Sequence, residues 1–202
     1  NPLLDSVYVT DNFYKENEDR MVFKNIYRLS EKDLKKLSNQ VNPLGMIALF
    51  NMPRVKKFIF KSKHVLILDG ISDPGNMGTI IRTADWFGFN HVFLGMDCVE
   101  VYNSKVVSAS MGSIFNASIN PDANLSKLIK DLKEEGYKII VTDLMGDEFE
   151  INKKDKIALV IGNEGKGVDR KLIAMADKRF KIMKSGKAES LNAAVAAGIV
   201  MN

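Results

Sequence analysis

Val65-Leu66-Ile67-Leu68-Asp69-Gly70, and the residues that follow it as far as Arg82, read VLILDGISDPGNMGTIIR. The first four residues form a β-branched and aliphatic run that ends at Asp69-Gly70, which predicts a buried strand. An apolar-periodic stretch follows over residues 80–87 and predicts a helix over 77–88. A strand, a turn and a helix in this order are typical of an open α/β sheet, which binds its ligands where strands end.

Two further segments occupy similar places later in the chain. The run Ile157-Ala158-Leu159-Val160-Ile161 predicts a strand buried on both faces, and IGNEGKG over residues 161–167 follows from its last residue. The three glycines of this segment allow the backbone to pass close to a ligand. Ser190-Leu191-Asn192 opens the last predicted helix. Serine is a common N-cap residue at the start of helices.

Strands and helices alternate from residue 64 onward, which predicts a parallel sheet with helices on both faces. The predicted strands cover 65–69, 91–95, 138–142, 157–161 and 179–183, and the predicted helices 77–88, 104–111, 124–135, 169–176 and 189–202. A dinucleotide site is disfavoured because no GxGxxG follows the first strand. A Walker A motif is absent as well, since neither Gly165-Lys166 nor Gly186-Lys187 is followed by serine or threonine.

The first third of the chain has its own organisation. Strands are predicted over residues 7–9, 22–27 and 46–50, with a short helix over 11–18. Ser30-Glu31-Lys32-Asp33 is a variant of the capping box, with Ser30 as the N-cap of a second helix.

Composition is that of a globular protein, with 202 residues of which 46% are hydrophobic and 27% charged. No apolar run is long enough to span a membrane, and no basic-then-apolar leader follows Asn1, so we expect a cytoplasmic protein whose true start lies outside this sequence. The single cysteine, Cys98, excludes a disulfide within the chain. With only His64 and His91 beside it there is no zinc ligand set, and we expect no metal site.

Positive charge is concentrated in the first third of the chain. Residues 1–64 hold 12 Lys and Arg against 7 Asp and Glu, whereas residues 65–202 hold 17 against 18. The excess peaks at Arg54, Lys56, Lys57, Lys61 and Lys63, with Phe58 and Phe60 among them. These residues form either a segment that binds RNA phosphates and stacks on bases, or a solvated linker whose phenylalanines pack into a domain.

Together the three segments resemble the motifs of the SpoU/TrmH branch of the SPOUT RNA methyltransferases. Residues 73–85 match the first motif, 161–167 the second and 182–192 the third. The resemblance implies an α/β methyltransferase domain over 64–202 with a parallel sheet and a C-terminal trefoil knot. Residues 1–52 are similar to the second half of the small α/β substrate-binding domain of this family, joined by a basic linker over 53–63.

The resemblance implies methylation of a ribose 2′-hydroxyl of RNA, with S-adenosylmethionine as the cofactor and ribosomal RNA preferred over transfer RNA. The knot would bring three loops around the cofactor. The implied cofactor contacts are Leu144, Gly146, Ile161, Gly162, Ile182, Met183 and Leu191. An apolar slot with backbone hydrogen bonds suits adenine, but the same residues could be core aliphatics and turn glycines, and for Ile182 or Leu191 alone the core interpretation is favoured.

Arg82 is the residue to which we assign the central catalytic role. A guanidinium group holds its proton too tightly to be a good base. We therefore expect it to bind the flanking phosphate and to stabilise the developing alkoxide, although proposals for the family give it a direct part in activating the hydroxyl. The alternative is a surface arginine paired with Asp85, three residues further along the helix.

Four other polar residues complete the expected site. Asn76 is either an N-cap or a group that orients the ribose. Glu164 is either an exposed loop acid or an anchor for the active-site loop or for Arg82. Ser190 and Asn192 would line the site and bind substrate and cofactor.

The family also implies a homodimer in which the helices that follow the first and third motifs pack across the interface. The apolar run over residues 193–199 fits this arrangement, because small residues allow helices to approach closely, but it could equally pack on the sheet of its own chain. Two other classes of function stay open: a non-catalytic RNA-binding or ribosome-assembly protein on the same scaffold, and a nucleotide-dependent metabolic enzyme. Five retained polar groups disfavour the first, and the missing glycine fingerprint disfavours the second.

Overall fold

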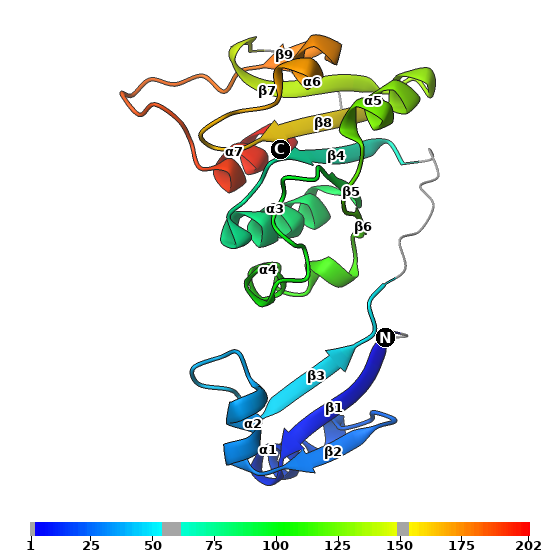
Figure 1. The fold of residues 1–202 in the computed structure, drawn as a ribbon, viewed down its shortest axis with the longest axis vertical. Coiled ribbons are helices and arrows are strands. Elements are labelled where there is room, and N and C mark those ends of the chain that lie inside the picture. Colours follow the sequence, from blue (N-terminus) through cyan, green and yellow to red (C-terminus); the bar gives the residue numbers. More distant parts are fainter. Residues whose placement is uncertain (1–2, 54–61, 149–153) are drawn as a thin grey trace. The chain divides into compact units, whose positions relative to one another are not determined.

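The computed structural model describes residues 3–53, 62–148 and 154–202. The chain divides into two compact units, Asn1–Arg54 and Val55–Asn202 (Figure 1). Most of the basic linker expected over 53–63 lies outside the described residues. No helix within the described ranges has the length and apolar character needed to cross a bilayer.

The first unit is a three-stranded sheet in the order β2-β1-β3, with β2 parallel and β3 antiparallel to the central strand. Its elements are β1 (Leu4–Thr10), α1 (Asp11–Glu16), the 3₁₀ helix η1 (Glu18–Arg20), β2 (Ile26–Leu29), α2 (Glu31–Leu37) and β3 (Met46–Phe50). The strand predicted over 22–27 is wrong by several residues. Val22 is 90% exposed, and pairing with β1 begins only at Ile26.

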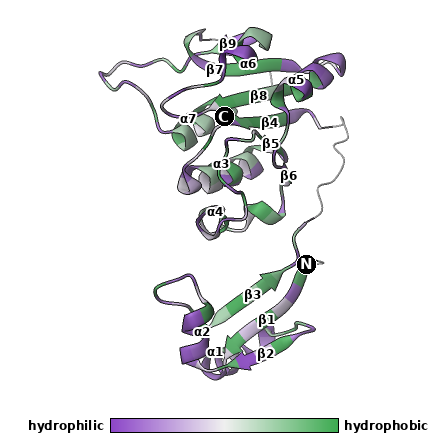
Figure 2. Ribbon diagram, viewed as in Figure 1, coloured by the Kyte–Doolittle hydropathy of each residue, from purple (hydrophilic) through white to green (hydrophobic). Residues whose placement is uncertain are grey.

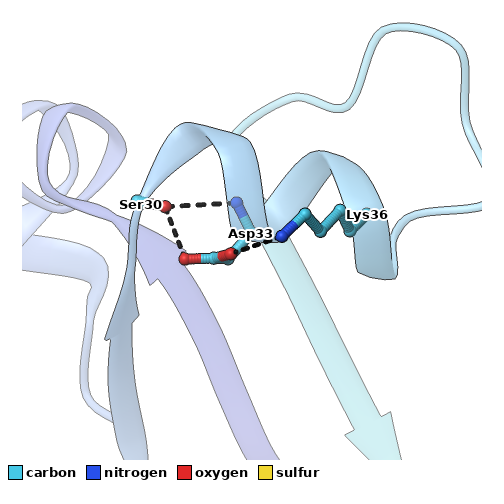
Figure 3. A network of polar contacts seen from close by, with 3 residues as sticks. All are labelled: Ser30, Asp33 and Lys36. Atoms are coloured by element: carbon cyan, nitrogen blue, oxygen red, sulfur yellow. Dashed lines mark hydrogen bonds and ion pairs between the residues drawn. The ribbon is translucent and has the colours of Figure 1, made fainter.

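Helix α2 begins as the sequence predicts. The Ser30 hydroxyl oxygen accepts a hydrogen bond from the Asp33 N–H at 3.1 Å, and the hydroxyl donates to the Asp33 carboxylate at 2.7 Å (Figure 3). Lys36 pairs with the same carboxylate at 3.4 Å. The hydrogen bond from Ser30, followed by Lys36, lowers the pKa of Asp33. This helix lies over β1 and buries Leu34 completely.

The second unit is a six-stranded sheet in the order β6-β5-β4-β8-β7-β9, and every neighbouring pair is parallel. The predicted parallel α/β sheet is therefore confirmed. Its strands are β4 (His64–Asp69), β5 (His91–Leu94), β6 (Ser118–Asn120), β7 (Lys138–Asp147), β8 (Ile157–Gly162) and β9 (Lys178–Phe180). Its helices are α3 (Pro74–Phe87), α4 (Ser104–Ala109), η2 (Ser113–Phe115), α5 (Leu125–Glu134), α6 (Arg170–Met175) and α7 (Ala193–Met201).

Helices cover both faces of this sheet. In β4, Leu66 and Leu68 pack with residues of α3 and α7, whereas Val65 and Ile67 face a second cluster formed with α5 and α6. All residues of β8 are buried. Figure 2 shows β4 and β8 as largely hydrophobic strands at the centre of the unit. Their carboxyl ends are consequently held rigidly between two apolar layers.

Three elements differ from the prediction, and the first two carry residues of the site. Helix α3 begins at Pro74 rather than at residue 77, because Asp73 caps it and proline suits the first helical position. Helix α7 begins at Ala193 rather than at residue 189, so Ser190 lies before the helix. Strand β6 was not predicted, since three residues give too short a pattern. The trefoil knot stays a prediction.

Candidate active site

The first two motifs meet at the carboxyl edge of the sheet. Strands β4 and β8 are parallel neighbours, and their last residues, Asp69 and Gly162, lie opposite each other. The loop that leads to α3 and the loop that leads to α6 therefore start side by side. Strand β7 lies on the other side of β8, and β9 follows it, so the ends of four strands share this edge.

Three predicted site residues form a hydrogen-bonded chain across all three motifs. The Asn76 side-chain N–H donates to the Glu164 carboxylate, and the Asn192 side-chain N–H donates to Asn76 Oδ1 at 2.8 Å. Asn76 and Glu164 are half-buried, and Asn192 is exposed. Residues from α3, from the loop after β8 and from the start of α7 are thus joined although 116 positions separate Asn76 from Asn192.

The helix caps differ from those considered in the sequence. Asp73 is the N-cap of α3, and its carboxylate accepts from the Asn76 N–H at 2.7 Å, so the N-cap interpretation of Asn76 is wrong. Asn192 is the N-cap of α7, accepting from the N–H groups of Ala194 and Val195 at 2.9 and 3.3 Å. Ser190 is exposed and takes no part in the chain of hydrogen bonds that joins Asn76, Glu164 and Asn192.

Arg82 lies on α3, two turns beyond Asn76, and does not join this chain of hydrogen bonds. Its side chain is exposed, and none of the ion pairs among the described residues includes it. The pairing with Asp85 considered in the sequence is wrong, because no ion pair among the described residues joins the two side chains. Asp85 accepts a hydrogen bond from Asn116 Nδ2 at 2.9 Å. The guanidinium group is available to a ligand.

Several of the predicted cofactor residues place apolar side chains in solvent at the same edge. Leu144 is 65% exposed, Met183 60% and Leu191 44%, so the core interpretation of Leu191 is wrong. Ile182 packs partly against the core, and Ile161 is buried within it. Exposed apolar side chains beside polar groups suit a ligand with an apolar ring, and contact with a cofactor stays a prediction for all seven residues.

Two of the glycines in this group have a structural role that the sequence did not reveal. A Cβ atom at Gly162 would lie less than 3.0 Å from the backbone of Gly167 and Val168. A Cβ atom at Gly146 would likewise approach the backbone of Arg179 within 3.0 Å. The close approaches that require glycine are thus made to the protein's own backbone, rather than left open for a ligand.

Asp69 also connects the loop after β4 with the loop after β8. Its carboxylate accepts from the Asp169 N–H at 2.7 Å, immediately before α6. Burial raises the pKa of Asp69 above its usual range, and the hydrogen bond from Asp169 partly opposes this effect. A carboxylate held in this way fixes the loop that carries Glu164 relative to the end of β4.

Most of the predicted RNA-binding cations lie outside the part of the chain that the structure describes. Arg54, Lys56, Lys57 and Lys61 lie outside the described residues, whereas Lys63 is exposed just before β4. Within the described ranges, no cluster of three or more His, Cys, Asp or Glu side chains could hold a metal ion.

Sequence reasoning did not identify Asn163, whose side chain also joins the two loops. Its position directly after a buried strand was the available signal.

Comparison with known proteins identifies the relatives of this chain. Residues 63–202 match the SpoU rRNA Methylase family. The chain is 37% identical over 177 residues to the 23S rRNA (guanosine(2553)-2′-O)-methyltransferase RlmP of Bacillus subtilis, covering 87% of this chain and 70% of that protein. It is also 37% identical over 140 residues to the 23S rRNA (guanosine-2′-O-)-methyltransferase RlmB of Neisseria meningitidis, covering 68% and 56%.

A solved structure agrees with this result. The AdoMet-bound rRNA methyltransferase from Sinorhizobium meliloti superposes with a TM-score of 0.84 at 26% identity, covering 98% of this chain and 78% of that chain. The parallel sheet and the loops at its carboxyl edge therefore define an α/β methyltransferase of the SPOUT type. Within that class, the chain belongs to the SpoU rRNA Methylase family.

Proposed function

We propose that this protein methylates a ribose 2′-hydroxyl of RNA with S-adenosylmethionine as the methyl donor, and that its substrate is ribosomal RNA rather than transfer RNA. The observation that carries the proposal is the chain of hydrogen bonds from Glu164 through Asn76 to Asn192, which joins three loops at the ligand-binding edge of the sheet. Relatives that methylate the guanosine 2′-oxygen of 23S rRNA support the choice of substrate.

The cofactor would bind against the loops that follow β7, β8 and β9. Leu144, Met183 and Leu191 supply exposed apolar side chains. Backbone groups at Gly146 and Gly162 would add hydrogen bonds, although both glycines also pack against the protein's own backbone. When bound, S-adenosylmethionine supplies an electrophilic methyl group. The lining fits it, since charged residues next to these apolar side chains already have partners: Asp143 pairs with Arg179 at 3.4 Å, and Lys184 Nζ donates to the Ala188 carbonyl oxygen at 3.2 Å.

The polar chain would hold the ribose. An asparagine amide offers two N–H donors and an oxygen with two lone pairs. Asn76 uses one N–H for Glu164 and one lone pair for Asn192, so a second donor and a second lone pair stay available. Because both ends of the amide are fixed, its orientation is set before the substrate arrives, and a ribose hydroxyl can be positioned without reorganisation.

Arg82 would act on the phosphate next to the target ribose. Its planar guanidinium can bind two phosphate oxygens at once, and its charge stabilises the alkoxide that develops as the hydroxyl loses its proton. The proton leaves to a phosphate oxygen or to water. Ser190, exposed between Met183 and the α7 cap, would contact substrate or cofactor from the third motif.

The domain division follows the one expected from the sequence. Residues 1–52 would be part of a substrate-binding domain, residues 53–63 the linker and residues 64–202 the methyltransferase domain. RNA phosphates would be bound by the basic residues of the linker: Arg54, Lys56, Lys57, Lys61 and Lys63. We place the enzyme in the cytoplasm, together with the ribosomal RNA that is its proposed substrate.

The proposed enzyme acts as a homodimer through α3 and α7. These helices are adjacent, since Thr83 of α3 lies 3.9 Å from the Cβ position of Gly198 in α7. Trp86 is 84% exposed, Val195 52% and Ile199 48%, so the pair of helices presents apolar side chains to solvent. An exposed apolar surface of this kind is typical of a protein interface. A second copy placed there would lie beside Arg82.

Sedimentation equilibrium tests the dimer. We expect a mass of twice the 22.6 kDa of one chain, and a shift towards the monomer in Trp86→Glu, because a buried charge at an apolar interface is costly. Leu44→Glu changes an equally exposed apolar residue of the first unit and should leave the mass unchanged. A wild-type protein that is monomeric at high concentration would contradict the proposal.

Transfer of labelled methyl groups tests the activity. The protein is incubated with labelled S-adenosylmethionine and with total RNA from cells that lack it, and the product is mapped by mass spectrometry. We expect label on a single ribose 2′-oxygen of ribosomal RNA. A protein that binds this RNA but transfers no label would favour the non-catalytic RNA-binding alternative.

A further inference from the structure

Asn163 is the residue through which the loop after β8 is attached to the loop after β4. Its Oδ1 accepts from the N–H groups of Gly165 and Lys166 at 2.9 and 3.1 Å. Its Nδ2 donates to the Gly70 carbonyl oxygen at 2.9 Å and lies 3.5 Å from Ser72 Oγ. One end of the amide thus shapes its own loop, and the other end holds a loop more than 90 residues earlier in the chain.

The loop that Asn163 shapes is a closed turn. The Asn163 carbonyl oxygen accepts from the Gly167 N–H at 2.9 Å, and the same two residues form an isolated antiparallel bridge. Gly162 lies directly against this turn. Glu164 is the first residue inside the turn, so the position of its carboxylate depends on how the turn is anchored.

The loop that Asn163 holds leads directly into α3. Gly70 and Ser72 precede Asp73, the N-cap of this helix, and Asn76 lies in its first turn. Fixing the distance between the two loops therefore fixes the distance between Glu164 and Asn76, which are joined by a hydrogen bond. Two hydrogen bonds therefore connect these loops: the one from Asn163 Nδ2 to the Gly70 carbonyl oxygen, and the one from the Asp169 N–H to the Asp69 carboxylate.

We propose that Asn163 is a positioning residue for methyl transfer, whose side-chain N–H sets Glu164 against Asn76 by clamping the loop after β8 to the loop before α3. It contacts no substrate and acts only through these two residues. The inference rests on the proposed function, since Glu164 and Asn76 matter to catalysis only if the protein is the methyltransferase described above.

Asn163→Asp removes the donor of the clamp and adds a negative charge, while keeping the shape and the acceptor of the side chain. A carboxylate has the same shape and can still accept from the Gly165 and Lys166 N–H groups, but it cannot donate to the Gly70 carbonyl oxygen. We expect kcat to fall by about 10- to 100-fold at about pH 8.5, with little change in KM for S-adenosylmethionine, because small displacements of catalytic groups cost rates of this order.

Acid should partly restore this variant. The protonated form of the introduced carboxyl has an O–H group that can donate to Gly70, and burial beside a carbonyl oxygen raises the pKa of such a group. The charged residues of the two loops are Asp69, Asp73, Glu164, Lys166 and Asp169. The acidic majority among them also favours protonation. The ratio of variant to wild-type kcat should therefore rise at least about threefold between about pH 8.5 and about pH 5.5.

Asn124→Asp is the matched control. Asn124 caps α5 through Oδ1 alone, accepting from the Lys127 N–H at 3.0 Å, and an aspartate caps equally well. Its kcat should stay within about twofold of wild type, with a ratio that does not depend on pH. A pH-independent ratio for Asn163→Asp, or an unchanged kcat, would overturn the proposal.

Hydrogen exchange separates failure of the clamp from failure of the proposed function. At one fixed pH, peptides that cover residues 69–77 should exchange at least about tenfold faster in Asn163→Asp than in wild type. In Asn124→Asp the exchange rate of these peptides should equal that of wild type. Unchanged exchange over 69–77 would refute the clamp whatever the activity. A wild-type protein that transfers no methyl group would instead refute the proposed function, and the positioning role with it, while leaving the clamp to the exchange result.

Discussion

Replacement of Arg82 by alanine should lower kcat for methyl transfer by about 1,000-fold, because a preorganised donor to developing negative charge contributes about 10²- to 10³-fold to turnover. The fold should be unaffected. Arg82 is exposed on α3, none of the ion pairs among the described residues includes it, and alanine is a good helix former. Single-turnover methyl transfer with saturating RNA and S-adenosylmethionine measures the effect.

Arg82→Lys keeps the charge but loses the planar fork, and should stay at least about tenfold below wild type. Near-normal turnover in this variant would show that charge alone is needed and would remove the bidentate phosphate role. Lys130→Ala is a suitable control, because it removes an exposed cation from α5, which lies on the opposite face of the sheet from α3.

Replacement of Gly162 by alanine should lower the free energy of unfolding by about 3 kcal/mol and the midpoint of thermal unfolding by about 6 to 12 °C. Gly162 ends β8, and the added methyl group would collide with the backbone of Gly167 and Val168. Backbone atoms cannot move aside as a flexible side chain can. The turn that holds Glu164 would have to separate from the strand, so activity should fall together with stability.

Thermal unfolding followed by circular dichroism measures this change. Gly186→Ala adds the same methyl group in the loop before α7, where no atom lies within 4 Å of the added position, and should unfold at the wild-type temperature. If the two variants unfolded at the same temperature, the close approach of the turn to β8 would not be important for stability.

The sequence predicted the scaffold well because its central strands have strong patterns. Residues 65–68 and 157–161 are aliphatic runs bounded by glycine and polar residues, and both lie in buried strands at the centre of the sheet. The predicted capping box at Ser30 is also present. Local chemistry determines each of these features, so a single sequence is enough to find them.

The contacts of the site could not be predicted in the same way. The bonds that join Asn76 to Glu164 and to Asn192 span 88 and 116 positions, and no local pattern encodes such pairings. The contact from Asn163 to Gly70 spans 93 positions and could not be predicted for the same reason. The start of α3 was placed too late because Asp73 and Pro74 act as a cap and first turn, although together they look like a turn.

The cap of α7 makes completion of the proposed site depend on the last part of the described chain to be synthesised. Asn192 starts the last helix of the described chain and donates to Asn76, so the polar chain is incomplete until that residue has been made and folded back onto α3. A ribosome that has translated the chain only as far as the end of β9 has produced all six strands of the sheet but not the full set of proposed site residues. Under the proposed function, unfinished copies would therefore lack part of the site that modifies RNA.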